Sequence, residues 1–121
     1  SYSVTGVQTC ALPIYGQLVI GMQTGIALYD GKTARVVLDL FKEKPASNVV
    51  SVATAADGSI WVGTGGGGLY FSANGETWKA YRTGEGVPSN FINVVYVDRY
   101  GTLWAGSGGS FDGGALLRIV P

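Results

Sequence analysis

The chain of 121 residues contains no histidine, one cysteine (Cys10) and no excess charge, with eight basic and eight acidic side chains. The lack of histidine excludes Ser-His-Asp catalysis and removes the commonest metal ligand and general base. Zero net charge without a basic run argues against a nucleic-acid partner. No apolar run approaches the ~20 residues of a membrane-spanning helix. We therefore predict no catalytic residue, no metal, no cofactor and no direct membrane contact.

The sequence also lacks a convincing helix, because glycine or β-branched residues interrupt every stretch that is long enough to form one. Its 20 glycines and 4 prolines fall below the usual range of low-complexity chains, and the glycines recur at periodic positions. What the chain does contain is a repeat. Residues 58–64 (GSIWVGT) and 101–107 (GTLWAGS) are two copies of one motif, and residues 16–21 (GQLVIG) are a degenerate third. The period of about 42 residues is typical of β-propeller blades.

Each period offers four short strands. In the middle unit these are an apolar strand from residue 49, the motif itself, residues 69–72 and residues 77–82. The Asp57-Gly58 pair between the first two is a strong hairpin signal. Ile60 and Val62 point to one face of their strand and Trp61 to the other, and both faces are apolar, as in a blade between two neighbours. Trp61 and Trp104 should therefore occupy equivalent sites one blade apart.

We predict an all-β fold, a β-propeller fragment of about two and a half four-stranded antiparallel blades. The blades cover residues 15–46, 47–88 and, incompletely, 89–121. Since an arc leaves its end faces uncovered, we expect apolar patches and self-association or aggregation. The residues expected in these patches are Val19, Leu28 and Val37 at one end and Leu103, Leu116 and Ile119 at the other.

A ligand is expected where the loop before the first strand and the loop between the second and third strands share one end of each blade. These loops are residues 44–48, 64–68, 84–90 and 107–114. The candidate ligand-binding residues in them are Ser47, Asn48, Thr64, Ser89, Asn90 and Ser107. Their alternative role is to cap the strands. Aromatic residues such as Trp61 and Trp104 could stack on sugars, but at strand positions they more often form inter-blade core.

The motif also resembles the two-component regulator propeller repeat. Residues 86–90 (GVPSN), the Asp98 to Gly101 turn and residues 103–107 (LWAGS) carry that resemblance almost completely, and it covers roughly residues 16–119. The resemblance implies a sensor propeller of a bacterial hybrid histidine kinase, on the periplasmic or extracellular side of the membrane. It further implies a small-molecule or carbohydrate ligand, with the missing blades of the same chain as partners.

Residues 72–78 (SANGETW) are similar to the Asp-box, a hairpin between the third and fourth strands in sialidases and other bacterial propellers. One residue is missing and Asn74 replaces the aspartate. The Asp-box lies remote from catalysis, so it supports the propeller more than an enzyme. Two alternatives to ligand sensing remain open, a propeller glycoside hydrolase or lyase of the Asp-box type and a structural interaction scaffold.

Residues 4–14 (VTGVQTCALPI) resemble the conceptual translation of a sequencing adapter. We therefore interpret residues 1–14 as a non-native segment and residues 15–121 as the partial propeller. The alternative is an ordinary strand of the first blade. An apolar stretch of either origin can pair with a vacant sheet edge.

Overall fold

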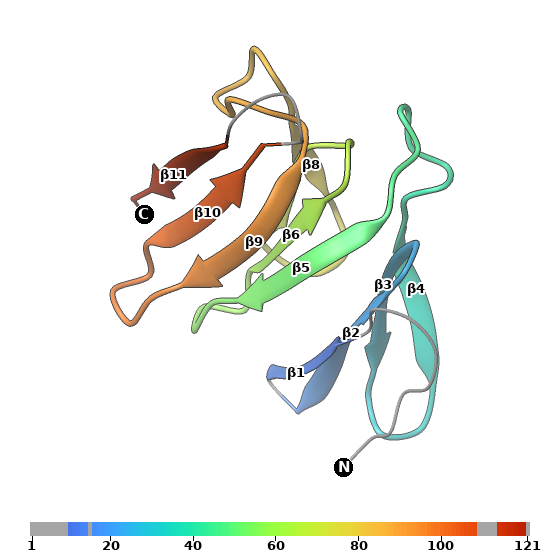
Figure 1. Cartoon of the computed structure of the whole chain (residues 1–121). Coiled ribbons are helices and arrows are strands. Elements are labelled where there is room, and N and C mark those ends of the chain that lie inside the picture. The colour runs from blue at the N-terminus through green and yellow to red at the C-terminus, as the bar shows by residue number, and fades with distance from the viewer. Residues whose placement is uncertain (1–9, 15, 109–113, 121) are drawn as a thin grey trace.

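The computed structural model describes residues 10–14, 16–108 and 114–120, which form three antiparallel sheets arranged in an arc (Figure 1). The first sheet contains β1 (Cys10–Ile14), β2 (Gln17–Met22), β3 (Gly25–Tyr29) and β4 (Ala34–Asp39). The second contains β5 (Val49–Thr54), β6 (Ile60–Thr64), β7 (Leu69–Ser72) and β8 (Lys79–Tyr81). The third contains β9 (Ile92–Val97), β10 (Leu103–Ser107) and β11 (Ala115–Ile119).

Strand order in every sheet follows chain order, and all neighbours are antiparallel. This arrangement of consecutive small sheets confirms the predicted all-β propeller architecture. No described residue lies in a helix, so no helix in this part of the chain could cross a membrane. Strand β1 takes the position in the first sheet that β5 and β9 take in the others. The adapter origin of residues 1–14 stays a hypothesis, and residues 1–9 lie outside the described part.

The register confirms that the two tryptophans are equivalent. Trp61 of β6 lies opposite Phe71 of β7, and Trp104 of β10 lies opposite Arg118 of β11. The same position in β2 holds Val19, opposite Leu28. Side chains alternate along a strand. In each sheet, the residue at this position (Val19, Trp61 or Trp104) therefore points to one face, and the residues directly before and after it point to the opposite face.

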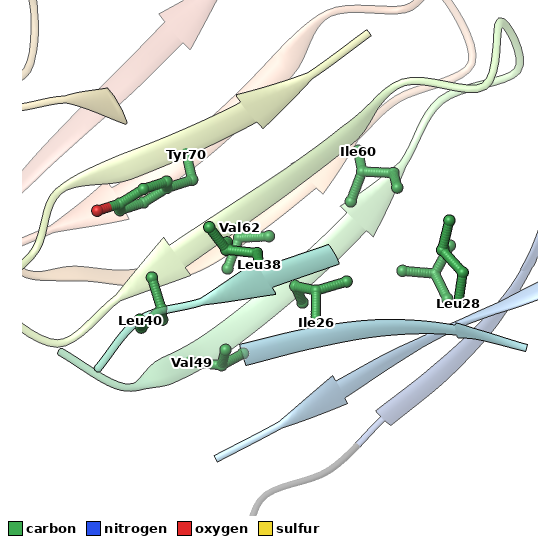
Figure 2. Close-up of a cluster of buried hydrophobic side chains, with 9 residues drawn as sticks. Ile26, Leu28, Leu38, Leu40, Val49, Ile60, Val62 and Tyr70 are labelled. Carbon is green, nitrogen blue, oxygen red and sulfur yellow. The ribbon is translucent and has the colours of Figure 1, made fainter. Parts of the chain in front are cut away.

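A first apolar core fills the space between the first and second sheets (Figure 2). Ile26, Leu28 and Leu38 enter it from the first sheet, and Ile60, Val62 and Tyr70 enter it from the second. Burial of one such side chain stabilises the fold by about 1.5–3 kcal/mol. Tyr70 is buried with its hydroxyl paired, because that hydroxyl donates to Glu43 Oε1 at 3.1 Å and accepts from Arg82 Nη2 at 2.8 Å.

A second core joins the second and third sheets. Leu69 and Ala53 contribute from the second sheet, and Ile92, Val95 and Leu103 contribute from the third. Trp61 packs against this cluster from the side of the second sheet. The middle sheet is therefore apolar on both faces, as its alternating sequence predicted.

The prediction of which end residues are exposed was partly wrong. Val19, Leu28 and Leu103 are at most 7% exposed, because each points toward the middle sheet. Val37 and Ile119 are partly buried against the two cores. Leu116 is 73% exposed and confirms the expectation.

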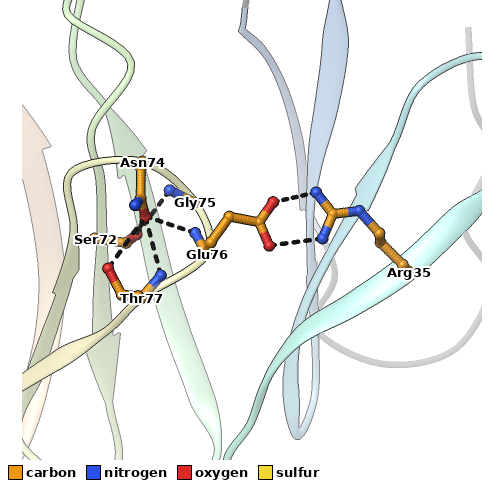
Figure 3. Close-up of polar contacts among 6 residues, drawn as sticks. All are labelled: Arg35, Ser72, Asn74, Gly75, Glu76 and Thr77. Atoms are coloured by element: carbon orange, nitrogen blue, oxygen red, sulfur yellow. Dashed lines mark hydrogen bonds and ion pairs between the residues drawn. The ribbon is translucent and has the colours of Figure 1, made fainter.

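The predicted Asp-box-like hairpin forms between β7 and β8 (Figure 3). Asn74 Oδ1 accepts from the backbone N–H groups of Glu76 and Thr77 at 2.8 and 3.0 Å, and Gly75 N–H donates to Ser72 Oγ at 2.7 Å. Glu76 forms a bidentate ion pair with Arg35 of β4. The hairpin of the second sheet is thereby tied to the outer strand of the first.

Candidate ligand-binding cleft

The predicted loops do meet at one end of the sheets. The N–H groups of Gly66 and Gly68 donate to the carbonyl of Asn90 at 3.1 and 2.9 Å, and Gly65 N–H donates to the carbonyl of Asn48 at 3.1 Å. Backbone hydrogen bonds therefore join the Gly-rich loop of the second sheet to the loops that precede β5 and β9.

Four of the six predicted site residues use their side chains inside these loops. Thr64 Oγ1 donates to the carbonyl of Gly68 at 2.6 Å, and Ser107 Oγ donates to that of Ala115 at 3.4 Å. Ser89 Oγ accepts from Phe91 N–H at 3.1 Å, and Asn90 Oδ1 accepts from Thr83 N–H at 2.7 Å. These contacts correspond to the strand-capping role, which was the alternative to ligand binding for these residues.

The other two predicted residues differ from these four. Asn48 contributes its backbone carbonyl, as described above. Ser47 is buried and its hydroxyl has no hydrogen-bond partner. It lies against the backbone of Gly67, where an added Cβ would come within 2.3 Å of Ser47 Oγ. The assignment of this end as the ligand site stays a prediction.

A cleft of about 460 Å³ opens at the opposite end, between the second and third sheets. Its apolar walls are Trp61 of β6, Phe71 of β7, Tyr100 of the β9–β10 turn and Ile119 of β11. The rings of Trp61 and Phe71 contact each other, with centroids 4.4 Å apart. Tyr100 is 72% exposed. The volume falls within the roughly 300–1,000 Å³ of small-molecule sites, which are also mostly apolar and aromatic.

The polar part of the lining comes from two turns. Asp57 and Ser59 belong to the β5–β6 turn, and Arg99 belongs to the β9–β10 turn. Ser59 donates to Asp57 Oδ1 from its hydroxyl at 2.6 Å and from its N–H at 3.0 Å. These hydrogen bonds hold the pKa of Asp57 below its ordinary value, so its carboxylate is charged at neutral pH. The Arg99 guanidinium lies 5.1 Å from the centroid of the Tyr100 ring.

The cleft can therefore hold a ligand with a flat apolar face and with hydroxyl or charged groups at its edge. Aromatic rings offer the stacking surface, while one carboxylate and one guanidinium offer charge-assisted hydrogen bonds. Within the described ranges, no group of three or more His, Cys, Asp or Glu side chains is placed to hold a metal ion.

This cleft is not evident from the sequence. The strand position of Trp61 indicates inter-blade core, with stacking on a sugar as the alternative, and Arg99 and Tyr100 are expected only as residues of a turn. A signal was present in the residue types of the two equivalent turns, which have the same length. The Asp98 to Gly101 turn carries Arg99 and Tyr100 where the other turn carries Ala56 and Asp57. The proximity of Arg99 and Tyr100 to Trp61 arises only when the third sheet packs on the second.

The sheets, their order and the hairpins define a β-propeller protein with BNR-type repeats. Residues 27–120 match the sequence profile of a family described as photosynthesis system II assembly factor YCF48, and the chain belongs to that family. No curated protein and no solved structure matches the chain. The match supports the propeller-type repeat found in the sequence. The narrower resemblance to two-component regulator propellers stays a hypothesis.

Proposed function

We propose that the chain is part of a non-catalytic recognition propeller that binds a carbohydrate in the cleft between the second and third sheets. The observation that carries this proposal is the combination of Trp61, Phe71 and Tyr100 with Asp57 and Arg99 around one cavity. A sugar ring has an apolar face that stacks on aromatic rings, and its hydroxyl groups pair with a carboxylate or a guanidinium.

The state of the carboxylates supports recognition without catalysis. Asp57 accepts two hydrogen bonds from Ser59. Asp98, at the equivalent turn, accepts from Trp104 Nε1 at 2.9 Å and from the N–H groups of Tyr100 and Thr102. Both groups have depressed pKa values. A general acid near neutral pH needs a raised pKa, so these two carboxyl groups are suited to fixed turns and ligand contacts.

The resemblance to sensor propellers suggests where this binding takes place and in what type of protein. In our proposal the ligand binds on the periplasmic or extracellular side of a bacterial signalling protein, and further blades of the same propeller complete the ring. Ligand binding can be measured on the chain alone, without the signalling partner or the membrane.

Titration calorimetry with a set of neutral and uronic-acid-containing oligosaccharides tests the proposal. Tyr100→Ala and Arg99→Ala should each weaken binding by about tenfold or more, because hydrogen bonds to charged groups and ring stacking contribute on the order of 1–3 kcal/mol. Phe41→Ala is the matched control, since Phe41 is aromatic, 71% exposed and not among the residues that line the cleft. Equal affinity in all three variants would contradict the assignment, as would the absence of saturable binding.

A protein-interaction scaffold is the second candidate, and the family description as an assembly factor favours it. Such a scaffold would use the same exposed turn residues for a polypeptide. The calorimetry separates the two, because a scaffold would show no saturable binding to any saccharide.

A further inference from the structure

The two charged groups in the cleft come from equivalent turns of different sheets. Asp57 lies in the β5–β6 turn and Arg99 lies in the β9–β10 turn. The position of Arg99 in its turn is that of Ala56 in the other, and the position of Tyr100 is that of Asp57. The second sheet therefore contributes a carboxylate to the lining, and the third sheet contributes a guanidinium.

The fold does not use the hydrogen-bond donors of Arg99. Within the described residues, its guanidinium forms no hydrogen bond and no ion pair, and it contacts only the ring of Tyr100. Two other arginines differ in this respect. Arg35 is paired with a carboxylate of the second sheet, and Arg82 donates to a backbone carbonyl and to a tyrosine hydroxyl. The N–H groups of Arg99 are therefore available to a ligand.

The carboxylates of the two turns are held by hydrogen bonds within their own sheets. Asp98 Oδ1 accepts from two N–H groups of its turn at 2.9 and 3.0 Å, and its Oδ2 accepts from Trp104 Nε1 at 2.9 Å. Asp57 Oδ1 accepts from the hydroxyl and the N–H of Ser59. Neither carboxylate forms an ion pair with Arg99, although all of these groups lie in the two described turns.

The shape of a guanidinium determines which ligand group pairs with it best. A guanidinium that contacts an aromatic ring still has N–H donors in its own plane for a further partner. A carboxylate accepts two parallel N–H bonds from such a fork, and these charge-assisted bonds are about twice as strong as neutral ones. The charged Asp57 in the same cleft repels further negative groups. The lining is thus suited to a ligand with one carboxylate.

We propose that Arg99 determines the specificity of the cleft and that the ligand is a saccharide with a single carboxylate, as in an oligosaccharide that contains one uronic acid. This inference rests on the proposed function, because it requires a carbohydrate in the cleft. Arg99 pairs with the carboxylate of the ligand, Asp57 accepts from its hydroxyl groups, and Trp61 stacks on the apolar face of the sugar ring.

Titration calorimetry on the full chain tests this specificity with pairs of ligands. Each pair consists of a disaccharide that contains one glucuronic, galacturonic or mannuronic acid and the methyl ester of the same disaccharide. The ester keeps the ring and the hydroxyl groups but has no charge. For at least one pair, the wild-type chain should bind the acid about tenfold or more tightly than the ester. Added salt should reduce this ratio, because it screens an exposed charge pair.

Three variants assign the preference to Arg99, which is exposed and has no described polar partner to lose. Arg99→Gln should bind the acid as weakly as the ester and leave the affinity for the ester unchanged. Arg99→Lys keeps the charge without the fork, so it should retain only part of the preference. Arg118→Gln is the matched control. Arg118 also belongs to the third sheet and lies over a ring, at 5.8 Å from the Trp104 centroid, but it does not line the cleft.

The possible results separate this inference from the proposed function. Saturable binding with equal affinities for acid and ester would overturn the role of Arg99 and leave carbohydrate binding intact. The same conclusion would follow from an unchanged preference in Arg99→Gln, or from an equal loss of preference in Arg118→Gln, which would indicate attraction by the overall charge. The absence of saturable binding to every acid and every ester would contradict the proposed function itself.

Discussion

At the scale of single residues, short polar side chains hold the turns in place through local hydrogen bonds. Asp30, Asp57, Asn74 and Asp98 each accept a backbone N–H from a residue two positions further on. Such local hydrogen bonds fix turns that carry few other contacts. Asp98 also accepts the indole N–H of Trp104, so that carboxylate connects a turn to a strand of its own sheet.

The pH dependence of stability should contain a contribution from Asp98. Its pKa lies below the ordinary 3.8, first because Trp104 donates to it and further because Thr102 and Tyr100 do. A carboxyl group whose pKa is depressed by folding stabilises the fold above its unfolded pKa, and this stability is lost as the pH falls through the folded pKa. Asp98→Asn should lower the melting temperature at pH 7, and its difference from the wild type should shrink below pH 4.

Thermal unfolding followed by circular dichroism between pH 2 and pH 7 measures this effect. Trp104→Phe provides a comparison, because it removes the indole donor and keeps the Asp98 carboxylate. That variant should also show a weaker acid dependence than the wild type. A constant difference between Asp98→Asn and the wild type at every pH would contradict the assignment.

At the scale of strands and sheets, the sequence predicted the hairpins closely, but it did not predict how the sheets pack on one another. The predicted third strand of the middle unit coincides with β7 (Leu69–Ser72). The predicted fourth strand began too early, because Thr77 still belongs to the turn held by Asn74, and β8 starts at Lys79. Turn chemistry thus determined where the strands begin and end.

The two equivalent glycines should respond differently to the same substitution. Gly63→Ala forces a methyl group against the backbone and side chain of Ile92, and overpacking of this kind costs about 1–3 kcal/mol. Gly106→Ala meets only Val94 Cγ1 at 3.0 Å, and that side chain is 53% exposed and free to rotate. Urea unfolding at low protein concentration should show a lower free energy of unfolding for Gly63→Ala and little change for Gly106→Ala. Equal losses would mean that the glycines serve strand geometry alone.

At the scale of the whole molecule, two separate cores join three sheets in a row. The first core connects the first two sheets and the second core connects the last two. In arrays where each unit contacts only its neighbours, stability is close to a sum of unit and interface contributions. We therefore expect the end sheets to open separately from the rest.

Ile26 and Ile92 provide a matched pair for this prediction, since both are isoleucines with 0% exposure, one in each core. Truncation of either to Ala should cost about 2–5 kcal/mol. Hydrogen exchange followed by mass spectrometry should then show faster exchange mainly in β2–β4 for Ile26→Ala and mainly in β9–β11 for Ile92→Ala. A uniform increase over all three sheets in both variants would mean that the chain unfolds as one cooperative unit.

The sequence alone determined the period, the hairpins and the equivalence of Trp61 and Trp104. These depend on alternation along a strand and on turn residues, which act over a few positions. Only the tertiary structure decided which faces are covered. Val19 and Trp104 hold the same position in their sheets, yet Val19 is fully buried and Trp104 is not. The cleft was decided in the same way, since Arg99 and Tyr100 come beside Trp61 only where two sheets meet. Burial depends on neighbours distant in the chain, and local patterns do not specify them.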